Sequence, residues 1–244
     1  MPSKDCKQYY IQLHNNCRSV IEQSFTNSLG ELQATAHNYL IEYEKWLEVI
    51  AGRPEHSIFE RACREYQFAL LTVSQGLYRQ AFMALRLFVE LVLGGIQLST
   101  NELELRLWLN NRTDTNWNSI VDEETGIFSA RFLSVFCPEL HDERGAIRTL
   151  ATQIYRECSE HVHGNPRTSE LVPEGISFSE ESFRHWHSLA KSSHFLLTFM
   201  FTVRYFKSLT AEQKLELETI IMDVLGHYAS IRSLYEDMNA GNMR

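Results

Sequence analysis

Residues 77–98 read LYRQAFMALRLFVELVLGGIQL, and this stretch is the strongest helical signal in the chain. Its apolar residues recur three or four positions apart, the spacing that puts side chains on one face of an α-helix. The stripe consists of Ala81, Ala84, Leu85, Phe88, Leu91 and Val92. Arg86 and Glu90 form an i,i+4 pair on the same helix, and Gly94-Gly95 weakens its end. A stripe this wide predicts a helix packed into a core.

The rest of the chain has the same helical character. Comparable runs cover residues 5–28, 31–51, 57–75, 145–163, 179–207, 210–225 and 227–238. Residues 99–142 are less regular and predict short helices at 103–109, near 117 and at 129–136. Only 11 glycines and 5 prolines occur, too few for an all-β protein with many tight turns. With 44% hydrophobic residues, the chain is predicted to be a packed, all-α protein.

The helical runs divide into three parts. Residues 1–56 are expected to form an N-terminal antiparallel helical pair, broken at Ser28-Leu29-Gly30 and ended by Gly52-Arg53-Pro54. Residues 57–207 are expected to form the main helical bundle, and residues 208–244 two closing helices. The chain holds no internal repeat and no low-complexity segment.

Charge and cysteine content narrow the function classes. A net charge of −8 argues against a broad, non-specific nucleic-acid binder, although a few arginines can still form a local site. Five cysteines without a Cys-x-x-Cys pair, after a polar start, predict reduced thiols in the cytoplasm. The apolar run Phe195–Phe206 is shorter than the roughly 20 residues of a membrane span and contains Arg204. We therefore expect a buried core helix and no membrane partner.

Residues 155–166, YRECSEHVHGNP, concentrate the residues suited to chemistry. Gly164 and the proline at 166 are stop signals for the helix before them. At about 100° per residue, Ser159, Glu160 and His163 share a face with Arg156, whereas His161 is rotated roughly 140° away. The spacing favours His163 as the histidine that acts beside Arg156. If the helix frays at Glu160, His161 can take that place instead.

These segments together resemble the HEPN family, whose members are helical bundles common in prokaryotic defence and toxin–antitoxin systems. The resemblance lies in LYRQAFMALR followed by FVEL at residues 77–91, and in the Arg-x(4–6)-His motif. That motif is Arg156-x6-His163, or Arg156-x4-His161. The form Tyr-x-x-x-Ser-x-x-Val-His-Gly at residues 155–164 is similar to a branch found in phage-defence proteins. The resemblance covers roughly residues 57–207 and implies a HEPN-type bundle.

Active members of that family cleave RNA without a metal, at a site where two copies of the motif meet in a homodimer. The resemblance thus implies an endoribonuclease with RNA as substrate and no cofactor. Histidine titrates near neutral pH and can move the proton, while an arginine can stabilise the charge that develops on phosphate. The implied catalytic residues are Arg156 and His163, with His161 as the alternative. Ser159, Asn165, Arg148 and Arg167 are expected to bind the substrate phosphates.

Other interpretations remain open. Glu157 stands where active members often carry Asn, His or Asp, and with the acidic net charge it favours a non-catalytic sensor or assembly subunit. Such a module would dimerise and bind an effector or antitoxin protein, or a nucleotide. A purely structural role is also open, with Arg156 paired to Glu160 and His163 capping its helix. The two His-x-His pairs, at 161–163 and 185–187, point about 200° apart in a helix, so neither predicts a metal site.

Overall fold

A computed structural model describes residues 5–163 and 172–241, and within them the chain is helical and holds no strand. The expected all-α class is therefore confirmed for this part of the chain. The helices are α1 (Cys6–Ser24), α2 (Asn27–Val49), α3 (His56–Ser74), α4 (Tyr78–Leu98), α5 (Glu102–Leu109), α6 (Trp117–Ile120), α7 (Ala130–Phe136), α8 (Arg144–His163), α10 (Glu180–Tyr205), α11 (Ala211–Leu225) and α12 (Ala229–Gly241). Two short 3₁₀ turns, Pro138–Glu143 and Phe206–Ser208, precede α8 and follow α10.

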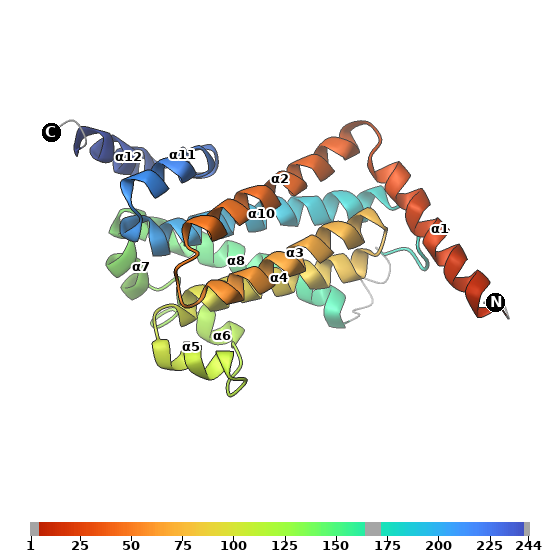
Figure 1. The fold of residues 1–244 in the computed structure, drawn as a ribbon, viewed down its shortest axis with the longest axis horizontal. Coiled ribbons are helices and arrows are strands. Elements are labelled where there is room, and N and C mark those ends of the chain that lie inside the picture. The colour runs from red at the N-terminus through yellow and green to blue at the C-terminus, as the bar shows by residue number, and fades with distance from the viewer. Residues whose placement is uncertain (1–4, 164–171, 242–244) are drawn as a thin grey trace.

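Helix α4 is the centre of the bundle, as its wide apolar stripe predicts. It packs against α3, α8 and α10 (Figure 1). The α3–α4 hairpin turns at Gly76, whose φ of 75° lies in the left-handed region that suits glycine. By length and composition alone α4 also passes the test for a membrane span, the one helix of the described residues that does. In the bundle, 61% of that apolar window is buried, so α4 occupies the position of a core helix.

Helix α10 lies beside α4 and is buried along most of its length. Ser179 caps its start by accepting a hydrogen bond from the Ser182 amide. The Trp186 indole N–H then donates to the Ala81 carbonyl of α4 over 3.1 Å. Residues 196–203 are all buried, which confirms that the apolar run in this part of the chain is a core helix. Apolar side chains lie on several faces of α10, and they are buried because α2, α4, α8 and α11 all pack on this helix.

The N-terminal helices differ from the sequence prediction. The expected break at residues 28–30 is wrong, because the chain turns earlier, where Thr26 adopts an extended conformation. Gly30 instead lies in the first turn of α2, where an added β-carbon would come within 3.0 Å of the Phe25 carbonyl oxygen. Glycine is thus needed there for a close approach rather than for a stop. Helix α2 packs against α3 and α10, whereas α1 extends away from the bundle instead of pairing with α2 (Figure 1).

The closing helices α11 and α12 share the core of the bundle. Thr210 and Gln213 form a capping box at the start of α11. The Gln213 side-chain amide also donates to the Val49 carbonyl at the end of α2 over 2.9 Å. A single hydrophobic cluster runs from Leu29 in α2 to Tyr235 in α12. The end of α2, the start of α11 and the middle of α10 are thereby held together.

Candidate functional site

Helix α8 carries the motif, and its apolar stripe sets the direction of every motif side chain. Ile147, Ala151, Ile154 and Cys158 recur at intervals of four, three and four residues and are all buried. They face α4 and α10, which pack on α8. His163 is the last residue of α8, and the predicted stop signals after it lie outside the described residues. Because the buried stripe is continuous, residues on the opposite side of α8 face solvent.

Arg156 lies on the exposed side of α8. Its side chain is 82% exposed, and its Nε atom is 4.0 Å from a carboxylate oxygen of Glu160. A pair this open and this long contributes little to stability. The same face forms a shallow hollow lined by Arg148, Thr149, Thr152, Gln153, Arg156, Glu157 and Glu160. All of these residues belong to α8, so the hollow has no opposite wall within the described part of the chain.

His161 points the other way, into the bundle. Its ring stacks on the Phe82 ring of α4 with 3.9 Å between centroids and 4° between planes. Only 5% of the residue is exposed, and among the described residues Nδ1 has no hydrogen-bond partner. Burial, followed by the nearby His185 and Arg79, lowers the pKa of His161 to about 4. A neutral, stacked imidazole in this position has the environment of a core residue.

The carbonyl of His161 has a separate role. It accepts a 2.8 Å hydrogen bond from Nε of Arg79, which lies at the start of α4. The last carbonyls of a helix lack partners within the helix, so a side chain from a neighbouring element satisfies one of them here. The contact also places a cation beside the C-terminal end of α8, where it is favoured by the helix dipole.

Glu157, the departure from the pattern of active family members, has two local partners. Its carboxylate lies 3.4 Å from Nε2 of His185 on α10 and accepts a 2.8 Å hydrogen bond from the Gln153 amide. The pairing with His185 connects α8 to α10 at the end of the bundle where Arg156 is exposed. In the sequence, His185 appears only as part of a His-x-His pair that was tested as a metal site. Its contact with Glu157 is not predictable from local spacing, because 28 residues separate the two side chains.

A polar cluster also joins α4 to α8. Arg86 donates a 2.6 Å hydrogen bond to the Tyr155 hydroxyl and lies over the Tyr155 ring, 4.5 Å from its centroid. The other face of that ring stacks on Trp117 of α6 at 3.9 Å. Arg86 is also 3.3 Å from Glu90, whose pKa is raised by burial against the opposing effect of Arg86. The Arg–Glu pair seen in the sequence therefore anchors the motif helix from inside.

The remaining expected substrate-binding residues fall into two groups. Ser159 donates its hydroxyl to the Tyr155 carbonyl over 2.5 Å, a common local bond within a helix. Arg148 donates to the Val121 carbonyl over 2.6 Å and pairs with Glu123 over 2.7 Å. Both side chains are thus engaged with the protein itself. Asn165 and Arg167 lie outside the described residues. His163 is the last residue of α8.

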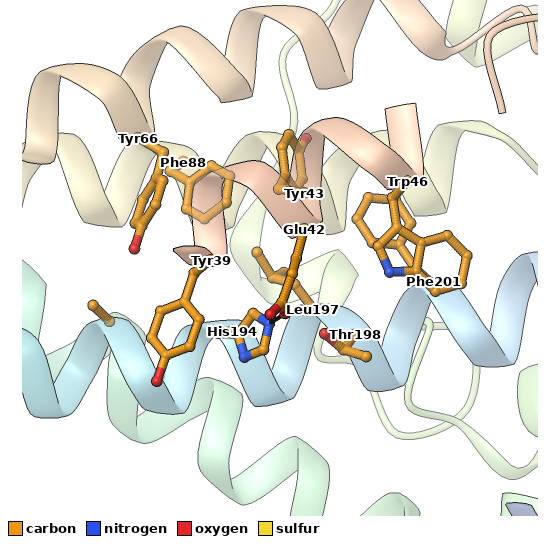
Figure 2. Close-up of a pocket in the computed structure, with 11 residues that line it drawn as sticks. Tyr39, Glu42, Tyr43, Trp46, Tyr66, Phe88, His194, Leu197, Thr198 and Phe201 are labelled. Atoms are coloured by element: carbon orange, nitrogen blue, oxygen red, sulfur yellow. Dashed lines mark hydrogen bonds and ion pairs between the residues drawn. The ribbon is translucent and has the colours of Figure 1, made fainter. Parts of the chain in front are cut away.

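A second candidate pocket lies between α2 and α10, and Figure 2 shows its side chains. His194 stacks on Tyr39 at 4.0 Å and lies 2.5 Å from the Glu42 carboxylate. Trp46 stacks on Phe201 at 5.3 Å, and its indole N–H is buried without a partner. The free cavity volume is only about 20 Å³, enough for about one water molecule. This cluster fastens α2 to α10 and has no room for a substrate.

Cysteine and metal chemistry have little support in the described residues. Burial raises the pKa of Cys63 to about 11 and the pKa values of Cys137 and Cys158 to about 12. These three thiols stay protonated at neutral pH, and the thiolate is the nucleophile. In the described part of the chain no three His, Cys, Asp or Glu side chains gather as metal ligands would.

Comparison of the chain with protein families, with characterised proteins and with solved structures found no match.

Proposed function

We propose that this protein is a metal-independent endoribonuclease of the HEPN type that acts as a homodimer, with Arg156 and His163 in its active site. The position of Arg156 carries the proposal. It is an exposed cation on a helix face that no other element covers within the described residues, and its ion pair there is a 4.0 Å contact to Glu160. An arginine held this loosely is available for a phosphate. On the resemblance of the motif, the proposal extends to a role in prokaryotic antiviral defence or in a toxin–antitoxin system.

The chemistry suits these two residue types. Cleavage of RNA by its own 2′-hydroxyl requires removal of a proton from that hydroxyl and delivery of a proton to the leaving oxygen. An imidazole near its ordinary pKa does both at neutral pH. The planar guanidinium of Arg156 donates two parallel hydrogen bonds to the phosphate oxygens, on which negative charge builds up. His161 is unsuited to this role, because its pKa of about 4 and its burial keep it neutral and out of contact with solvent.

A second copy is needed to bring the two groups together. Seven residues separate Arg156 from His163, so they share a face of α8 but stand roughly 10 Å apart along its axis. Two α8 helices that cross a two-fold axis perpendicular to them run antiparallel and can place Arg156 of one copy beside His163 of the other. The axis then passes between Ser159 and Glu160, where the small Ser159 side chain already donates to the Tyr155 carbonyl of its own helix. A side chain of that size lets a second helix approach closely.

A non-catalytic sensor or assembly subunit is the second candidate, and the acidic side chains beside Arg156 favour it. Glu157 and Glu160 line the same hollow, and their charge opposes the approach of a phosphate. Glu157 is held in place by His185, so it does not simply turn away. In this alternative the α8 face binds an effector or antitoxin protein, and Arg156 contributes to that interface.

The deciding experiment is an RNA-cleavage assay in EDTA with purified full-length protein. We expect wild type to cleave, and Arg156→Ala and His163→Ala each to lose roughly a hundredfold or more in rate. Arg106→Ala is a matched control, since Arg106 is also exposed and also pairs with a glutamate four residues away. His37→Ala, at an exposed position on α2, controls for loss of a histidine. Full activity in both site variants would contradict the proposal. If wild type does not cleave RNA but forms a stable complex with the co-expressed product of a neighbouring gene, the result would support the assembly-subunit alternative.

A mixing experiment tests whether the site is shared between copies. Arg156→Ala and His163→Ala proteins are each expected to be inactive, but after mixing and subunit exchange they form hybrid dimers. Half of the dimers are hybrids, and each hybrid has one complete site of its two. We expect about one quarter of the wild-type rate. No recovery after verified exchange would mean that each site takes both residues from one copy.

A further inference from the structure

Helix α1 carries an apolar stripe that the bundle covers at one end only. The stripe recurs at alternating intervals of four and three residues, which is the heptad spacing of two-stranded coiled coils. It consists of Cys6, Tyr10, Leu13, Cys17 and Val20, and the polar Ser24 takes the next position of the same spacing. This pattern continues without interruption over all of α1, whereas the contacts of α1 with the bundle are confined to its C-terminal part.

The C-terminal end of the stripe is docked. Val20 is 1% exposed and packs over Gly76, where an added β-carbon would lie 3.1 Å from its methyl groups. The Ser24 hydroxyl is buried and lies 3.1 Å from the Ser74 carbonyl, at the end of α3. The heptad face is therefore a packing surface where the bundle reaches it.

The N-terminal end of the same face projects from the bundle (Figure 1). Every described residue from Asp5 to Gln12 is exposed, and Tyr10 is 64% exposed. Asp5 caps the helix by accepting hydrogen bonds from the Lys7 and Gln8 amides. Helices of about a dozen residues are marginal in water without tertiary packing. Within the part of the chain that the structure describes, no element covers the stripe at Cys6 and Tyr10, and a partner explains this most simply.

We propose that the partner is α1 of a second copy of this chain, packed antiparallel across a two-fold axis between residues 11 and 12. In that arrangement Tyr10 packs against Leu13 of the second copy, and Cys6 lies opposite Cys17 of the second copy. Each pair joins an a position with a d position, as antiparallel coiled coils require. The free part of the stripe is thus complementary to itself.

The antiparallel direction follows from length and charge. The overlap of residues 6–17 combines the exposed residues 6–12 with the half-buried Leu13 and Cys17, and it ends just before Val20, where the helix docks on the bundle of its own copy. A parallel pair would instead bring both bundles to the same end of the helices. Asp5 then lies near Arg18 of the second copy, and Lys7 lies near the neutral Asn16, so like charges do not meet. The interface uses α1 and not the α8 face, so it stands independently of the proposed ribonuclease function.

The first test measures mass by sedimentation between about 1 and 200 µM, since two short helices bury less than the roughly 1,200 Å² of a standard stable interface. The mass of wild type is expected to at least double across this range, since a monomer forms a dimer, whereas a dimer formed through α8 carries two α1 helices and forms a tetramer or a larger species. Leu13→Asp should abolish the doubling and keep the circular dichroism and melting temperature of wild type. Leu103→Asp, at a leucine 65% exposed on α5, is the control and should still double. Equal masses for wild type and Leu13→Asp at every concentration would overturn the proposal.

The second test uses the two cysteines of the stripe. Diamide oxidises two thiols to a disulfide when their α-carbons lie within about 7 Å. Wild type should form a covalent dimer, whereas Cys6→Ser and Cys17→Ser should each remain uncrosslinked, because like cysteines then stand roughly 16 Å apart. A mixture of the two variants should recover the crosslink through Cys6 of one and Cys17 of the other. If the Cys6→Ser variant formed a crosslink by itself, Cys17 would lie opposite Cys17 and the helices would be parallel. The absence of a crosslink in wild type would contradict the pairing. The three remaining cysteines are buried and do not interfere.

Discussion

Replacement of His161 by phenylalanine tests the view that this histidine is a neutral core residue. The phenylalanine ring keeps the stack on Phe82 and removes the Nδ1 atom that is buried without a partner. Removing an unsatisfied polar atom favours the folded state, while the slightly larger ring opposes it. At pH 7 we therefore expect His161→Phe to change the free energy of unfolding by less than about 1 kcal/mol.

The pH dependence supplies the magnitude. The pKa of His161 is about 4 in the folded protein and 6.5 when unperturbed, so between these values the unfolded chain binds the extra proton. The stability due to the neutral ring is complete above pH 6.5 and is lost as the pH falls toward 4. At pH 5 linkage gives about 2 kcal/mol.

The assay is urea denaturation of wild type and His161→Phe at pH 7, 6 and 5. Wild type should lose about 2 kcal/mol more than the variant between pH 7 and pH 5. His187, whose pKa is also lowered to about 4 by burial, is present in both proteins and cancels in the comparison. His37→Gln, at an exposed site, should follow wild type. Equal pH dependence of wild type and His161→Phe would refute the assignment. Loss of RNA cleavage in the folded variant would return the catalytic role to His161.

Three further changes test other parts of the structure. Gly95→Ala should destabilise the protein by about 1 to 3 kcal/mol, measured by urea denaturation, because the added β-carbon would lie 2.6 Å from the Phe59 ring. Tyr205→Phe removes a 2.7 Å hydrogen bond to the buried Glu55 carboxylate and should cost about 1.5 to 3 kcal/mol in the same measurement. Arg148→Ala removes two hydrogen bonds to the segment after α6 and should lower the melting temperature by a few degrees, yet leave the rate of RNA cleavage nearly unchanged.

Much of the fold was predictable because helix formation depends on local patterns. The apolar stripes of α4, α8 and α10 placed these helices within a few residues of their observed bounds. The break between α1 and α2 was misplaced. Glycine is a residue type that often ends helices, but Gly30 lies inside α2, where it lets the chain pass close to the Phe25 carbonyl. That distinction requires knowledge of the neighbouring backbone.

The candidate site was predictable in part. Helical spacing established that Arg156 and His161 point in different directions, and the apolar positions Ile147, Ala151, Ile154 and Cys158 continue at the same spacing to His161, which marks its side as the inner one. The structure adds what His161 contacts there, the ring of Phe82. Likewise, the pairing of Arg148 with Glu123 and of Glu157 with His185 joins side chains 25 and 28 residues apart. No local sequence pattern predicts contacts between side chains that lie so far apart in the chain.

Local periodicity was therefore enough to establish an all-α chain, the position of its central helix and the helix that carries the motif. Tertiary packing was needed to determine which motif side chains remain available to a phosphate and that α1 leaves the bundle. The physical reason is one of range. Backbone hydrogen bonds in a helix join residues four apart, so the sequence around each residue governs them. The burial of a side chain and the shift of its pKa depend on segments that only the folded chain brings together.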